Sequence, residues 1–177
     1  TAGTASEATI NYVITDEARK VKMVIVDTNS IATIAVNDAD LMVDMPASLT
    51  AATGMDALTH AIEGYITKGA SPFTNMYNLE AIKAVSQNLE RAVKDGSDIE
   101  AREGMAYGQF ITGMGFSNCG LGIVHSMAHQ LGGFYDLPHG VCNAILLPYV
   151  MEYNAEETGD KYRTIAEAMG VDTEGMD

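Results

Sequence analysis

Five residues with metal-binding side chains occur at spacings that would bring them together. Asp56 precedes His60 by four residues, and His125 precedes His129 by the same interval. On an α-helix, residues four apart share one face with their Cβ atoms about 6 Å apart, so each pair could converge on one cation. His139 follows a proline and would stand at a helix start, where a loop can direct it sideways. The chain has no other histidine, and this grouping indicates a metal site.

Simpler interpretations stay open from spacing alone. A single histidine on an alanine-rich helix is more often a packed core residue than a ligand, and the His-x-x-x-His spacing recurs by chance. The donors are imidazole and carboxylate without thiolate, which excludes a cysteine-rich structural zinc site. Such donors suit Zn, Fe(II), Co or Ni about equally. Ser126 follows His125, so the His-Glu-x-x-His signature of zinc proteases is absent.

A cation with an open coordination position would polarise a carbonyl group or stabilise an alkoxide. This chemistry suits the interconversion of alcohols and aldehydes. It also suits other reactions that need a Lewis acid, and the residues alone do not choose between them.

The elements that position these residues change in character near Pro46. Before it, β-branched residues at 9–15 and 21–26 flank a polar segment and predict a β-hairpin, with a further short strand at 31–36. After it, apolar residues recur at helical spacing. Predicted helices cover residues 47–67, 72–95 with Ser71 as N-cap, 98–116 with Ser97 as N-cap, and 121–131 ended by Gly132-Gly133, followed by one beginning near His139 and a last one at 161–169. Four glycines at positions 104, 108, 113 and 115 indicate either close helix packing or backbone approach to a ligand.

Composition excludes several classes of function. The formal net charge of −14, with 10 basic and 24 acidic residues, argues against a nucleic-acid partner, which would require a basic surface. The longest strongly apolar stretch, residues 141–151, is interrupted by Asn143 and Pro148. It is shorter than the roughly 20 residues that cross a bilayer, so no membrane partner is expected. Cys119 and Cys142 are interpreted as free thiols of a reducing, cytoplasmic compartment.

Two longer motifs resemble a known family. Gly-Met-Asp-Ala-Leu-Thr-His-Ala-Ile-Glu at 54–63 is similar to one signature of the iron-containing (group III) alcohol dehydrogenases. Gly-Ile-Val-His-Ser-Met-Ala-His at 122–129, continuing to Pro-His-Gly-Val at 138–141, is similar to the other. Several stretches, among them residues 10–17 and 113–118, most resemble the lactaldehyde reductase (propanediol oxidoreductase) branch. The segment 128–133 is more similar to the ethanol and 1,3-propanediol dehydrogenases.

The resemblance implies a mainly α fold: a helical metal-binding domain of the dehydroquinate synthase-like type, preceded by a β-hairpin remnant of an α/β nucleotide-binding domain. Residues 1–45 would end the dinucleotide-binding domain, and residues 46–177 would form the metal domain, truncated at its C-terminus. The implied site residues are four ligands of Fe(II), a catalytic histidine beside them and three cofactor contacts. The ligands would be Asp56, His60, His125 and His139, the catalytic residue His129, and the cofactor contacts Thr1, Thr4 and Lys22.

By the same resemblance, the reaction would be hydride transfer between NAD(H), or NADP(H), and a small primary alcohol, diol or aldehyde. The full-length protein would be a homo-oligomer. The family's Gly-Gly-Gly-Ser phosphate loop is not present in the sequence, so we expect a fragment that binds the dinucleotide poorly and is inactive alone. Two alternatives remain. One is a zinc-dependent relative similar to glycerol dehydrogenase, and the other is a non-catalytic assembly piece of a fused aldehyde–alcohol dehydrogenase.

Overall fold

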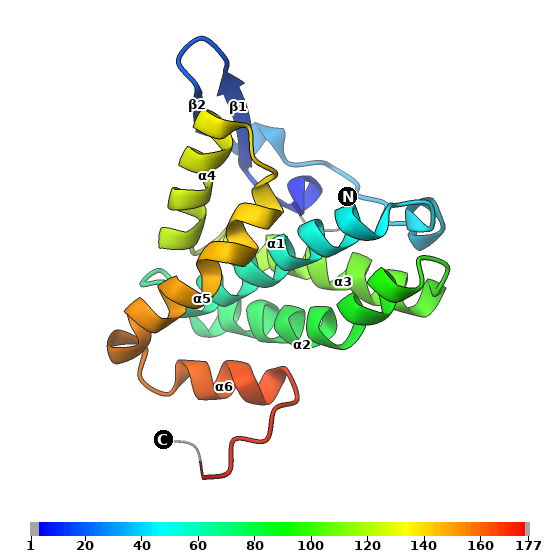
Figure 1. Ribbon diagram of the computed structural model, residues 1–177, viewed down its shortest axis with the longest axis vertical. Coiled ribbons are helices and arrows are strands. Elements are labelled where there is room, and N and C mark those ends of the chain that lie inside the picture. The colour runs from blue at the N-terminus through cyan, green and yellow to red at the C-terminus, as the bar shows by residue number, and fades with distance from the viewer. Residues whose placement is uncertain (1–3, 176–177) are drawn as a thin grey trace.

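The computed structural model describes residues 4–175, and its N-terminal part is a two-stranded antiparallel hairpin (Figure 1). Strand β1 (Asn11–Asp16) pairs with β2 (Val21–Val26), with Asn11 opposite Val26 and Asp16 opposite Val21. The polar linker turns because Asp16 accepts hydrogen bonds from the backbone and side chain of Arg19. The predicted hairpin is therefore confirmed.

The prediction of a third strand at residues 31–36 is wrong. This segment has no regular secondary structure, and the sheet consists of β1 and β2 within the described residues. Ile34 and Val36 are 80% and 84% exposed. A β-branched run forms a strand only where a neighbouring strand accepts its hydrogen bonds, and none lies beside this one.

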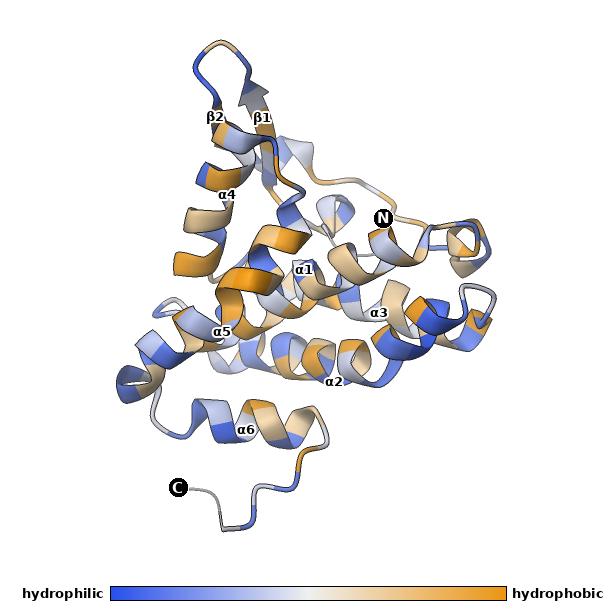
Figure 2. Cartoon of the chain, viewed as in Figure 1, coloured by the Kyte–Doolittle hydropathy of each residue, from blue (hydrophilic) through white to orange (hydrophobic). Residues whose placement is uncertain are grey.

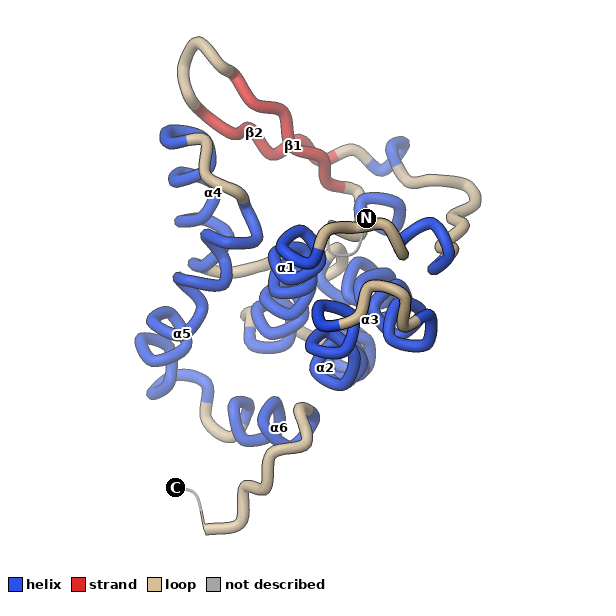
Figure 3. The backbone as a smooth tube through the Cα atoms, turned by 45° about the vertical axis from the view of Figure 1, so that its right-hand side comes forward, coloured by secondary structure: helices blue, strands red, loops and turns tan. Residues whose placement is uncertain are grey.

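Within residues 4–175, six α-helices follow the hairpin, at nearly the positions that the sequence predicts. Three of them, α1, α2 and α3, lie side by side, and α1 also packs against α5 (Figure 3). Helix α4 lies beside β2, whereas α6 contacts α2 at the other end of the molecule (Figure 1). The helices are α1 (Ala47–Ile66), α2 (Pro72–Lys94), α3 (Ile99–Phe116), α4 (Ile123–Tyr135), α5 (His139–Thr158) and α6 (Lys161–Ala168); short 3-10 helices cover Ser6–Ala8, Thr28–Ser30 and Ala39–Met42. No helix among residues 4–175 has the length and apolarity needed to cross a membrane.

The core lies around α1. Apolar residues recur along the helices, interleaved with polar ones (Figure 2), and most of the buried ones form one cluster to which all six helices contribute. From Asp56 to Tyr65 every residue of α1 is buried. Because α1 is enclosed in this way, polar side chains on its inner face must find partners inside the protein.

Three of the four glycines of α3, at positions 104, 108 and 115, serve close packing against α2, whereas Gly113 packs against Ala5 of the N-terminal segment. A Cβ at Gly108 would lie 3.0 Å from Val85, and one at Gly115 would lie 2.8 Å from the side-chain carbon of Asn78. Both contacts are tighter than real Cβ atoms tolerate without movement. Helix packing therefore explains these glycines.

Two predicted helix boundaries are wrong. Asp98, not Ser97, caps α3, because its carboxylate accepts from the Ala101 N–H while Ser97 bonds to Asp95 instead. The pair Gly132-Gly133 does not end α4, which continues to Tyr135. A Cβ at Gly133 would lie 3.0 Å from the Lys20 carbonyl oxygen. The glycine therefore allows the hairpin backbone to pack closely against α4 and does not end the helix. The Ser71 cap of α2 is confirmed.

Candidate metal centre

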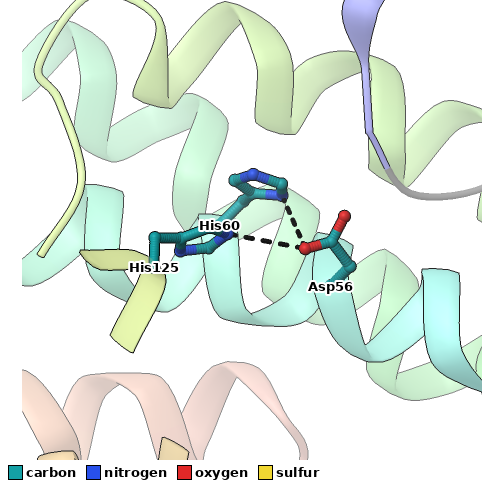
Figure 4. Close-up of side chains that lie close together, drawn as sticks. All are labelled: Asp56, His60 and His125. Carbon is teal, nitrogen blue, oxygen red and sulfur yellow. Dashed lines mark ion pairs between the residues drawn. The ribbon is translucent and has the colours of Figure 1, made fainter. Parts of the chain in front are cut away.

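Three helices bring the predicted ligands to one place. Helix α1 carries Asp56 and His60 on its buried face, α4 supplies His125 from its first turn, and His139 is the first residue of α5. Figure 4 shows Asp56, His60 and His125 directed toward one another. The three side chains are almost completely buried, with exposed fractions of 2%, 6% and 4%.

One oxygen of Asp56 is the centre of this cluster. Its Oδ1 lies 3.8 Å from His60 Nδ1, 3.5 Å from His125 Nε2 and 3.3 Å from His139 Nε2. The donor atoms of Asp56, His60 and His125 all lie within 4.8 Å of one another. His139 joins them through Asp56 and is the most exposed of the four, with a quarter of its side chain accessible.

The protonation states suit metal binding. Burial lowers the pKa of His60 from 6.5 to about 3, and burial also lowers that of His139, so both imidazoles are neutral near pH 7. Burial acts to raise the pKa of Asp56, but its histidine neighbours outweigh burial and lower the pKa to about 2. His60 and His139 therefore offer neutral imidazoles and Asp56 an anionic carboxylate, which are the forms that ligate cations.

His125 differs from the other histidines. Burial acts to lower its pKa, but hydrogen bonds to Asp56 and Glu63 outweigh burial and raise the pKa above its usual value. Both carboxylates stabilise the protonated form of the His125 ring. A cation that binds here would compete with a proton for His125.

The residues fit a divalent cation. His60 Nδ1 is buried and has no hydrogen-bond partner, although it faces the Asp56 carboxylate at 3.8 Å. A buried nitrogen without a partner is costly, and a cation between these donors would satisfy it. One carboxylate and three imidazoles form a donor set that suits Fe(II) and Zn(II) alike.

Asn143 also belongs to this cluster, although it was not among the predicted site residues. It lies one turn after His139 on α5, and its Nδ2 donates to Asp56 Oδ1 over 2.6 Å. The same nitrogen lies 3.1 Å from His125 Nε2 and 3.2 Å from His139 Nε2. The amide therefore stands beside the atoms that a cation would need. Its helical spacing from His139 is a signal that could have identified it.

Glu63 is a second residue at the site that was not among the predicted ligands. It follows His60 by three residues on α1, and its Oε2 lies 2.6 Å from His125 Nδ1. Asp56, His60 and Glu63 thus occupy positions i, i+4 and i+7 of one helix face. That spacing could have indicated a third polar residue at the site.

A cavity of about 690 Å³ opens beside the cluster. Its walls include the four predicted ligands together with Thr4, Lys22 and His129. The structure thus places Thr4 and Lys22 on the same cavity as the cluster, whereas Thr1 lies outside the described residues.

His129 lies one turn beyond His125 on α4 and is partly exposed to the cavity. Its ring centroid is 5.0 Å from that of His139 and 6.3 Å from that of His125. Burial and the neighbouring positive groups, including Lys22, lower the pKa of His129 to about 4. It is therefore a neutral imidazole at the cavity wall, able to donate or accept a hydrogen bond.

Comparison with known proteins gives one consistent result. Residues 50–177 match the family described as "Fe-containing alcohol dehydrogenase family, C-terminal". The chain is 59% identical over 176 residues to lactaldehyde reductase of Escherichia coli (strain K12), and 53% identical to 1,3-propanediol dehydrogenase of Citrobacter freundii. It is 50% identical to NAD-dependent methanol dehydrogenase of Bacillus methanolicus. Each of these matches covers 99% of this chain but only 46% of the relative, so the chain spans about half of their length.

Solved structures agree in fold. The crystal structure of a 1,3-propanediol oxidoreductase superposes with a TM-score of 0.96 at 52% identity, covering 100% of this chain and 46% of the other. An alcohol dehydrogenase from Oenococcus oeni gives the same TM-score and coverage at 45% identity. These similarities confirm the resemblance inferred from the two motifs and the mainly helical fold that it implied.

Proposed function

Because the chain belongs to the iron-containing alcohol dehydrogenase family, we propose that it forms the metal-binding part of an enzyme that interconverts small alcohols and aldehydes. The observation that carries this proposal is the convergence of Asp56, His60, His125 and His139 beside a cavity. Imidazole nitrogens gathered around one buried carboxylate form a donor set that a catalytic cation can bind.

The proposed ligands are these four residues, and Fe(II) is the proposed metal. When bound, the cation supplies Lewis-acid polarisation of a substrate oxygen, and a nicotinamide supplies the hydride chemistry. The protein's own residues provide the charge balance: Asp56 contributes a negative charge, and burial keeps His60 and His139 unprotonated.

His129 is proposed to position the substrate or to move a proton near it. Its neutral ring lies on the cavity wall, 5.0 Å from the ring of His139. A neutral imidazole can accept a proton on one nitrogen while it donates from the other. Lys22 and Thr4, which line the same cavity, are the proposed contacts to the dinucleotide.

The finer assignments are proposals that follow from the relatives. A small primary alcohol or diol is the proposed substrate, because the relatives are named for lactaldehyde, 1,3-propanediol and methanol. NAD(H) is the proposed cofactor, because one relative is named NAD-dependent. We also propose a division of the chain near residue 45 into a nucleotide-binding remnant and a metal domain, and a homo-oligomeric, cytoplasmic enzyme.

The test is an assay of aldehyde-dependent NADH oxidation with added Fe(II), using the longest natural polypeptide that contains this chain. NADPH, lactaldehyde and 3-hydroxypropanal are compared in parallel. We expect H125A and H139A to abolish turnover while the protein stays folded. Retained turnover in either variant would refute the ligand assignment.

The metal requires a separate measurement, because the donor set also suits zinc. Metal analysis after anaerobic purification, followed by reconstitution with Fe(II) or Zn(II), identifies the active ion. Activity restored by zinc and not by iron would contradict the proposed Fe(II).

A further inference from the structure

Helix α4 begins without a capping side chain of its own. Its N-cap residue is Gly122, which cannot accept a hydrogen bond through a side chain. The first N–H groups of a helix need acceptors. Here the acceptor comes from another helix: Glu63 Oε1, on α1, accepts from the Val124 N–H over 2.8 Å, and Oε2 accepts from the His125 N–H over 3.3 Å.

The same carboxylate also holds the ring of His125. Glu63 Oε2 lies 2.6 Å from His125 Nδ1, and the two side chains are only 2% and 5% exposed. A carboxylate accepts hydrogen bonds, so the Nδ1–H of His125 donates a hydrogen bond to Glu63. This leaves Nε2 directed at Asp56 Oδ1, 3.5 Å away. One residue therefore fixes both the start of α4 and the tautomer and direction of the imidazole that α4 presents.

Gly122 makes room for this arrangement. A Cβ at Gly122 would lie 2.6 Å from Glu63 Oε1 and 3.2 Å from the carboxylate carbon. Any larger residue would push the carboxylate away from both the backbone and the ring. Gly122 and Glu63 thus act together to fix the start of α4, although they are 59 positions apart in the sequence.

We propose that Glu63 is a positioning residue for the metal centre: it aligns His125 for ligation by holding its backbone and its Nδ1–H together. The inference rests on the proposed metal site and adds a function for a residue outside the ligand set. Carboxylates that accept from the second nitrogen of a ligating histidine typically contribute a factor of 10–100 to metal affinity.

The test measures Co(II) binding to the metal-stripped protein, by its visible absorption and by competition with a chelating dye. Glu63→Gln keeps the size of the side chain but replaces one acceptor oxygen with an NH₂ group. We expect about 10–100-fold weaker Co(II) binding. Glu63→Gln in a His125→Ala background should then cost almost nothing further, because a residue that acts through His125 has no role once that ring is gone.

Two further variants separate positioning from general stability. Gly122→Ala keeps the carboxylate but displaces it, so it should weaken Co(II) binding in the same direction. It also tests the contact if E63Q does not fold. Asp98→Ala removes the N-cap of α3, whose carboxylate accepts from the Ala101 N–H. We expect D98A to lower the melting temperature and leave Co(II) affinity unchanged.

The outcomes distinguish a failure of the positioning role of Glu63 from a failure of the proposed metal site. Wild-type affinity in both E63Q and G122A would overturn the positioning role while leaving the metal site intact. An E63Q effect of equal size with and without His125 would overturn it as well, because the loss would then come from the fold. If the wild-type protein did not bind Co(II), the proposed metal centre would fail and this role with it.

Discussion

Gly140 lies where α5 starts against α1, and its replacement by alanine tests how tightly the helices hold the site. The glycine is buried and directly follows His139. A Cβ at this position would overlap the carbonyl oxygen of Ala52 and lie 2.6 Å from its carbonyl carbon. These are backbone atoms of α1, which cannot rotate away as a side chain can.

The size of the effect follows from two opposing contributions. Alanine favours a helix interior over glycine by about 1 kcal/mol, so an isolated helix would gain stability. A Cβ at Gly140 would lie 2.0 Å from the Ala52 carbonyl oxygen, whereas ordinary Cβ contacts begin at 3.4 Å, so the start of α5 must move by 1.4 Å. Such overpacking costs about 1–3 kcal/mol, and we expect a net loss near 1 kcal/mol. His139 would move with the helix, and functional sites tolerate only about 0.5 Å. Metal affinity should therefore fall about tenfold or more.

Thermal unfolding and Co(II) titration of Gly140→Ala measure these two effects separately. Gly104→Ala is the matched control, because its Cβ would meet the Asn88 side chain between α3 and α2, away from the metal centre. We expect the control to lose stability without losing Co(II) affinity. A Gly140→Ala protein with wild-type affinity would refute the argument that α5 packing sets the position of His139.

Three further predictions concern charge. Metal affinity should increase as the pH rises above the ordinary histidine pKa of 6.5, because the pKa of His125 is raised and its proton competes with the cation; Co(II) titrations that show no pH dependence would contradict this. Lys22→Met should raise the pKa of His129, which that ammonium helps to hold near 4; histidine NMR titrations would detect the change, and an unchanged pKa would disprove the coupling. Arg102→Met should cost about 3 kcal/mol, because the buried guanidinium donates to two backbone carbonyls and one hydroxyl; denaturant unfolding with an unchanged midpoint would show that these bonds contribute little.

Local features were predictable because their causes lie within a few residues. Ser71 followed by Pro72 forms a capped helix start whatever surrounds it. The i,i+4 pair Asp56 and His60 shares a face as soon as α1 is helical. The two signature motifs, residues 54–63 and 122–141, were long enough to indicate the family without any structure.

The errors occurred where a distant neighbour decided the outcome. Residues 31–36 have β-branched side chains, but no strand lies beside them, so they stay irregular. Gly132-Gly133 would end an isolated helix, yet α4 continues because Gly133 accommodates the backbone of the hairpin. Neither neighbour is visible in the local sequence.

The candidate site likewise combines features that follow from local sequence with features that depend on helix packing. The residue types and the pairs that share a helix face follow from the sequence. The packing of α4 and α5 against α1 is what brings His125 and His139 to one oxygen of Asp56. It also gave Glu63 and Asn143 their partners, across 62 and 87 positions of sequence. Hydrogen bonds over such separations depend on helix packing, because only a shared buried core brings those backbones within reach of one another.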